Sequence, residues 1–77
     1  MAILKVVTPS GFFLIDCDLP LATTMHYAAK HAAEEIGEDS DEGEYFLIDW
    51  ETKKEVEKED IVMNWKGKKM VLGMRKG

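Results

Sequence analysis

Residues 23–37 have the spacing of an amphipathic helix, and this segment constrains the fold more than any other part of the sequence. Its apolar residues recur every three or four positions, which places them on one stripe: Met25, Ala28, Ala29, Ala32, Ala33 and Ile36. Thr23 or Thr24 can accept from the free N–H groups of the first turn. Gly37 can end the helix because a residue without Cβ enters the left-handed conformation cheaply. A helix this short cannot bury its stripe alone, so we expect it to lie across a sheet.

The other apolar segments have the composition of short strands. Residues 2–8 are rich in β-branched side chains, and Pro9-Ser10-Gly11 then supplies a turn before residues 12–18. Two strands joined this closely are expected to pair antiparallel as a hairpin. The later strands are expected at residues 45–50, 55–57 (a short, charged edge strand) and 69–75. Residues 59–65 fit either a helical turn or a strand.

This order of elements predicts an α+β fold, a hairpin followed by one helix and two or three further strands. The helix crossover allows the first and last strands to lie side by side in the middle of the sheet, where they would run parallel. We expect Ile3 to lie in the neighbourhood of Val71 in that pair. Such a mixed sheet with one helix packed across one face is a β-grasp.

The length of 77 residues suits one domain, residues 1–77, which buries roughly 60–65% of the surface that the unfolded chain exposes. A core of that size leaves little room for a deep active-site cavity. The single Cys17 cannot form an internal disulfide, and the first residues show no signal peptide. We therefore expect a soluble, cytoplasmic and monomeric protein.

Charge is distributed unevenly along the chain, whose net charge is −5. Residues 1–52 hold two basic against eleven acidic residues, and residues 53–77 hold eight basic against four acidic ones. The overall sign argues against direct binding of nucleic acid, because phosphate contacts need a basic surface. The acidic loop at residues 38–44 lacks the spacing of a calcium-binding loop.

The residue types that carry catalysis or bind metals are sparse and poorly spaced. His26 and His31 stand five residues apart on the expected helix and so do not share a face. Cys17 lies between two aspartates, which raise a thiol pKa, and no second cysteine completes a zinc set. We expect no enzyme, no metal and no cofactor.

The chain resembles ubiquitin over most of its length. The features that carry the resemblance are Met1, Ile3, Gly11 in the hairpin turn, Pro20 before the threonine-capped helix, Gly37 at its end, Asp60-Ile61, and the closing strand from Met70 to Gly77. Ubiquitin-like modifiers and sulfur carriers end in Gly-Gly, which threads the narrow channel of an activating enzyme. Here Lys76 stands before Gly77, a departure that puts conjugation in doubt.

The resemblance implies that partners dock on the face of the sheet away from the helix. Candidates for that face are Phe12, Leu14, Leu47, Trp65, Lys69 and Val71, with Leu4 as a further one depending on register. Of the two tryptophans, Trp65 beside Lys66-Gly67 is expected to be the exposed one. A slip of one residue would exchange these residues with the core set.

The sequence thus predicts a non-catalytic ubiquitin-like domain that binds other proteins through the open face of its sheet. One alternative is a covalent modifier or sulfur carrier acting through Gly77. Another is an acidic regulatory protein that mimics nucleic acid and inhibits a partner, which predicts affinity that falls steeply with salt. No membrane partner is expected.

Overall fold

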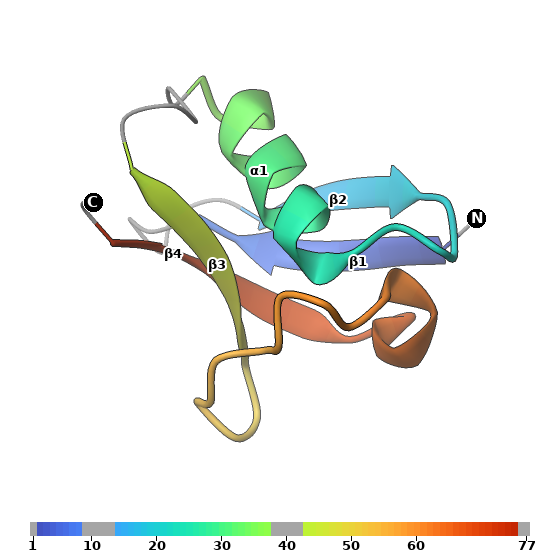
Figure 1. Ribbon diagram of the computed structural model, residues 1–77. Coiled ribbons are helices and arrows are strands. Elements are labelled where there is room, and N and C mark those ends of the chain that lie inside the picture. The colour runs from blue at the N-terminus through green and yellow to red at the C-terminus, as the bar shows by residue number, and fades with distance from the viewer. Residues whose placement is uncertain (1, 9–13, 38–42, 76–77) are drawn as a thin grey trace.

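The computed structural model describes residues 2–8, 14–37 and 43–75, and it shows one helix packed on a four-stranded sheet (Figure 1). The elements in chain order are β1 (Ala2–Val7), β2 (Leu14–Leu19), α1 (Met25–Glu35), β3 (Glu44–Asp49), the 3₁₀ helix η1 (Val62–Trp65) and β4 (Lys69–Arg75). The predicted strands at residues 2–8, 45–50 and 69–75 are confirmed to within one residue at either end. The second strand is described from Leu14 onward.

The strand order is β2-β1-β4-β3, with β1 and β4 parallel in the centre and both outer pairs antiparallel. The predicted β-grasp, and with it the α+β fold, is therefore confirmed. The register corrects one detail, because Val71 pairs with Val7 and not near Ile3. The carbonyl of Ile3 instead accepts from the N–H of Gly67, at 3.2 Å.

Helix α1 begins and ends where the capping residues predict. The Thr24 hydroxyl oxygen accepts from the Tyr27 N–H at 3.3 Å, so Thr24 rather than Thr23 is the cap. Gly37 adopts a φ of +81°, and its N–H donates to the carbonyl of Glu34 at 3.1 Å. This left-handed conformation is the one that a side chain disfavours, which explains a glycine at this position.

The segment before η1 closes the amino-terminal end of α1. The Met25 N–H donates to the Asp60 carbonyl at 2.7 Å, and the His26 N–H donates to the Lys58 carbonyl at 3.0 Å. These are two of the N–H groups that a helix leaves without internal partners. The ambiguity over residues 59–65 is resolved in favour of a helical turn, since η1 occupies their second half.

The edge strand expected at residues 55–57 is wrong. Glu55 forms one isolated antiparallel bridge with Ile48, and the Val56 N–H donates to the Leu47 carbonyl at 2.8 Å. Val56 itself is buried and contributes to the core. The segment crosses the edge of β3 once and then turns toward α1, so pairing does not extend into a strand.

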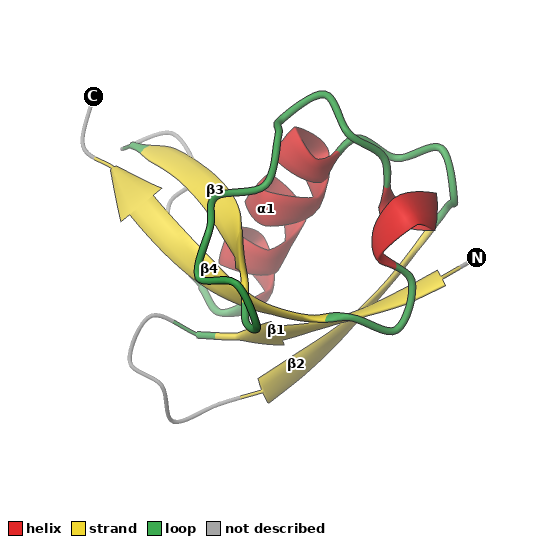
Figure 2. Ribbon diagram, turned by 90° about the horizontal axis from the view of Figure 1, so that it is seen from below, coloured by secondary structure: helices red, strands yellow, loops and turns green. Residues whose placement is uncertain are grey.

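The core lies between α1 and one face of the sheet (Figure 2). The stripe of α1 that faces the sheet is mostly alanine, which allows a close approach of helix and sheet, and its buried residues are Met25, Ala28, Ala29, Ala32 and Ala33. Large side chains from the sheet fill the space opposite, including Leu4, Leu47, Met70 and Leu72, each at most 2% exposed. This packing leaves the other face of the sheet without a helix among the described residues.

Candidate functional site

The open face of the sheet carries a continuous row of apolar side chains. It consists of the residues that alternate with the core residues along each strand. Register pairs join Leu14 to Val7, Val7 to Val71, and Val71 to Ile48, so the row crosses all four strands. Val7 is buried, Val71 and Ile48 are half-buried, and Leu14 is 52% exposed. The row thus crosses the whole sheet, and its solvent-exposed area comes from Leu14, Val71 and Ile48.

A row of charged side chains lies beside the apolar row on the same face, and it crosses β4 at Lys69, two residues before Val71. Asp16 pairs with Lys5 and Lys5 with Lys69, and the Trp50 N–H donates to the Lys69 carbonyl at 3.1 Å. Trp50 is 38% exposed, and its ring lies 4.1 Å from the Nζ atom of Lys69 and 4.2 Å from that of Lys53. Ammonium groups at such distances are attracted to the indole face. The open face therefore combines an apolar strip with an exposed tryptophan and a lysine rim.

Phe46 covers the open face at the carboxyl end of β4. It pairs with Gly73, where an added Cβ would stand 2.6 Å from the Phe46 ring. The guanidinium carbon of Arg75 lies 4.6 Å from the centre of the same ring. The absence of a side chain at Gly73 leaves room for the Phe46 ring at this point of β4.

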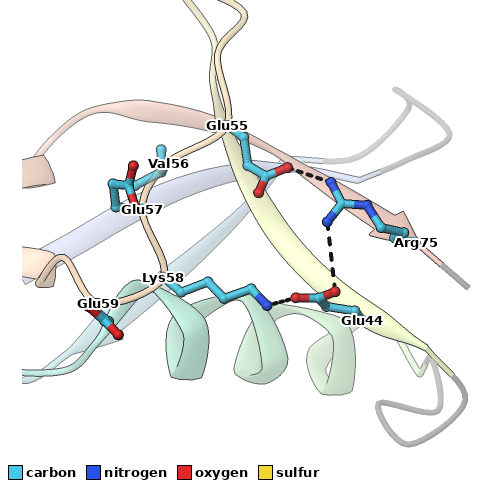
Figure 3. A pocket seen from close by; sticks show the side chains of 7 residues that line it. All are labelled: Glu44, Glu55, Val56, Glu57, Lys58, Glu59 and Arg75. Atoms are coloured by element: carbon cyan, nitrogen blue, oxygen red, sulfur yellow. Dashed lines mark hydrogen bonds and ion pairs between the residues drawn. The ribbon is translucent and has the colours of Figure 1, made fainter. Parts of the chain in front are cut away.

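An ion-pair network joins the ends of β3 and β4 to the segment after residue 54 (Figure 3). The Arg75 guanidinium contacts Glu55 Oε1 at 2.6 Å and Glu44 Oε2 at 3.7 Å, and Lys58 pairs with the other oxygen of Glu44. These groups line a cleft of about 440 Å³ together with Val56, Glu57 and Glu59. All four paired side chains are partly exposed, so each pair contributes little to stability. We infer that the network holds the segment from Glu55 to Lys58 against the ends of β3 and β4.

Three of the candidate residues lie on the open face, where the resemblance placed them. Leu14 and Val71 belong to the apolar row, and Lys69 belongs to the charged row. Their role in binding stays a prediction. Phe12 and Gly77 lie outside the described residues.

Leu47 does not lie on the open face, and this part of the prediction is wrong. Leu47 pairs with Leu72, and both side chains are buried against α1. Leu4 is likewise fully buried. The cause is register, because residues 45–48 are apolar on both faces and alternation alone does not say which face is the core.

The choice of Trp65 as the exposed tryptophan is also wrong. Trp65 is half-buried against the core, and its Nε1–H donates to Asp60 Oδ2 at 2.8 Å. Of the two tryptophans that are candidates from the sequence, Trp50 is the exposed one. The strand pattern offered a signal, since Trp50 is two residues beyond Ile48 and so shares its face.

Cys17 is buried on the core side of β2. Burial, together with the smaller effects of the negative charges of Glu35 and Asp16, raises the pKa of its thiol to about 11. A thiol of this kind is neutral at physiological pH and is a poor nucleophile. The predicted direction of the pKa shift is thus confirmed, although burial contributes more than the neighbouring charges.

We predict that iodoacetamide alkylates Cys17 of the folded protein at pH 8 about 100-fold more slowly than the unfolded chain, from the lower thiolate fraction alone. Mass spectrometry with and without denaturant measures both rates. Equal rates would show that Cys17 is accessible and reactive in the fold.

The histidines of α1 lie on its outer side. His26 is exposed, and His31 Nε2 lies 3.6 Å from Glu35 Oε1 one turn later. Within residues 2–8, 14–37 and 43–75, no group of three or more His, Cys, Asp or Glu side chains is placed to hold a metal ion. In the same part of the chain, no helix has the length and apolar character needed to cross a membrane.

Comparison with known proteins supports the fold. No family model and no curated protein matches the sequence. Among solved structures, the chain is similar to the solution structure of an N-terminal ubiquitin-like domain, with a TM-score of 0.71 and 18% identity. The match covers 99% of this chain and 76% of that one. The fold is therefore that of a ubiquitin-like domain.

Proposed function

We propose that this chain is a single non-catalytic domain that binds another protein through the open face of its sheet. The observation that carries the proposal is the apolar row from Leu14 through Val7 and Val71 to Ile48. In a small domain, apolar side chains gathered on one face and rimmed by charge are typical of a protein interaction site.

The neighbouring groups on the face support this function. Trp50 and Phe46 offer aromatic area that can be buried at low cost in side-chain entropy, and Lys69 and Arg75 lie over their rings. Catalysis is not supported by the chemistry of the described residues, because the thiol of Cys17 is buried and its pKa is raised. A binding surface accounts for these features without an active site.

The test replaces the centre of the apolar row by Val71→Thr together with Ile48→Thr. Threonine keeps the branched shape that suits a strand and puts a hydroxyl in place of a methyl group of Val71 and of the ethyl group of Ile48. Partners are captured from the native cell with tagged wild-type protein and with the double variant, and are quantified by mass spectrometry. We expect specific partners to bind the double variant about tenfold or more weakly, since central interface residues contribute at least about 1 kcal/mol each.

The matched control is Tyr27→Ser on α1. Tyr27 is 58% exposed and lies on the side of the molecule opposite the open face. We expect this variant to retain the partners, and thermal unfolding of each variant shows whether it is folded. If Tyr27→Ser loses these partners while the variant with Val71→Thr and Ile48→Thr retains them, the interface lies on the helix instead.

A further inference from the structure

We infer that Trp50, Lys53 and Lys69 form a binding site for carboxylate groups, and that the docked protein presents an acidic segment to it. The inference rests on the proposed docking face and adds the chemistry of the partner. It concerns the charged row, whereas the apolar row defines the face itself.

The two ammonium groups of the site both lie over the ring of Trp50. Their Nζ atoms lie 4.2 Å (Lys53) and 4.1 Å (Lys69) from the centre of the Trp50 ring. Lys69 belongs to β4 and Lys53 to the turn after β3, so two separate elements converge on one ring. Lysine side chains ordered before binding lose less entropy when a ligand arrives.

The turn that carries Lys53 is tightly built. Lys53 has a φ of +63°, a left-handed conformation that is uncommon for residues other than glycine. Its N–H donates to the Asp49 carbonyl at 2.9 Å, while the Asp49 carboxylate accepts from the Glu51 N–H at 3.2 Å and the Thr52 hydroxyl at 3.1 Å. A backbone held in an unfavourable conformation by surrounding bonds is a feature of functional sites.

The part of the chain that the structure describes leaves the charges of Lys53 and Lys69 unpaired. Lys58 and Arg75 form ion pairs with glutamates, and Lys5 stands opposite Asp16 in register. No carboxylate within residues 2–8, 14–37 and 43–75 forms an ion pair with Lys53 or Lys69. Two fixed positive charges without a partner are therefore available to carboxylates from outside.

An acidic protein segment fits the site better than a nucleic acid does. Base stacking needs a free ring face, and the Trp50 ring is already covered by two ammonium groups that stacking would displace. Lys69 and Val71 are two residues apart on β4, roughly 7 Å, so one segment with a carboxylate and an apolar side chain at that separation reaches both rows.

The test uses two synthetic peptides with the full-length chain. In one, Glu and Leu residues alternate with Gly-Ser spacers; in the other, Gln replaces each Glu. The nuclear magnetic resonance signal of the Trp50 indole N–H reports binding at low salt, where charge interactions are least screened. We expect the Glu peptide to shift this signal and to bind about three- to tenfold more tightly than the Gln peptide.

Two double variants with the same change of charge locate the site. Lys53→Gln with Lys69→Gln should reduce the affinity for the Glu peptide about three- to tenfold, and Lys30→Gln with Lys66→Gln should leave it unchanged. Equal binding of the two peptides, no shift with either, or an equal loss in both double variants would overturn the inference. So would tighter binding of an oligo-dT strand or of phosphatidylserine vesicles than of the Glu peptide.

Failure of this inference is distinguishable from failure of the proposed function. If the variant with Ile48→Thr and Val71→Thr loses the captured partners while the variant with Lys53→Gln and Lys69→Gln retains them, the docking face is supported and the carboxylate site is wrong. If the variant with Ile48→Thr and Val71→Thr retains the partners, the docking face itself is wrong.

Discussion

Replacing Leu47 with alanine is expected to lower the free energy of unfolding by about 2–5 kcal/mol, the range measured for buried leucines. The side chain is 2% exposed and lies in the core beneath α1, opposite Leu72. Its removal loses the transfer free energy of the buried carbons and leaves a cavity that the surrounding residues fill only in part. Urea unfolding followed by circular dichroism measures the change.

The matched control is Leu14→Ala, the same substitution at a residue of the open face. Leu14 is 52% exposed, so we expect its effect to stay within about 0.5–1 kcal/mol. A loss at Leu47 no larger than about 1 kcal/mol would contradict its place in the core, as expected if β3 were shifted by one residue against β4.

Replacing Asp60 with alanine is expected to destabilise the fold by about 1–2 kcal/mol, a range that allows for the solvent exposure of this carboxylate. Asp60 Oδ1 accepts from the Ile61 N–H at 2.8 Å and from Asn64 Nδ2 at 2.5 Å, and its Oδ2 accepts from Trp65 Nε1. Alanine leaves the half-buried indole N–H without its partner. Thermal unfolding of the two proteins at pH 7 measures the difference.

The stabilisation from Asp60 should depend on pH. Hydrogen bonds from Asn64, Trp65 and Ile61 favour the charged form and hold the Asp60 pKa below its ordinary value of 3.8. The unfolded chain takes up this proton at a higher pH, so the contribution is complete above about pH 5 and disappears as pH falls through the folded pKa. We expect the gap between wild type and Asp60→Ala to narrow below about pH 4. A constant gap would show that the carboxylate charge contributes nothing.

The helix and the strand order could be predicted because local signals and topology agree. The alanine-rich stripe, Thr24 and Gly37 define both ends of α1 to within two residues. The sequence also shows which face of β4 is buried, since Lys69, Gly73 and Arg75 share one face while the apolar Met70 and Leu72 share the other. These elements needed no knowledge of long-range pairing.

Which face of β3 is buried could not be predicted, because here the local sequence gives no signal. Tyr45, Phe46, Leu47 and Ile48 are all apolar, so the strand has no polar face to mark the solvent side. Its partner β4 follows a connection that includes η1, and no tight turn sets the register. The sequence alone therefore does not distinguish an outward Leu47 from a buried one or show that Trp50 is exposed, and the pairing of β3 with β4 decides both.

The charges of the carboxyl-terminal third were visible in the sequence, but their roles depend on contacts. Lys58 and Arg75 are engaged by glutamates, while Lys53 and Lys69 converge on Trp50. A count of basic residues does not separate these two sets. The distinction requires knowing which strand ends and turns lie together.

The most direct test of the central claim is a map of backbone amide shifts in the labelled protein when a partner recovered from the native cell is added. We expect the largest changes on the open face, at residues 46, 48, 50, 69 and 71, with little change along α1. Changes concentrated on the outer side of α1, at residues 26–34, would contradict docking through the sheet.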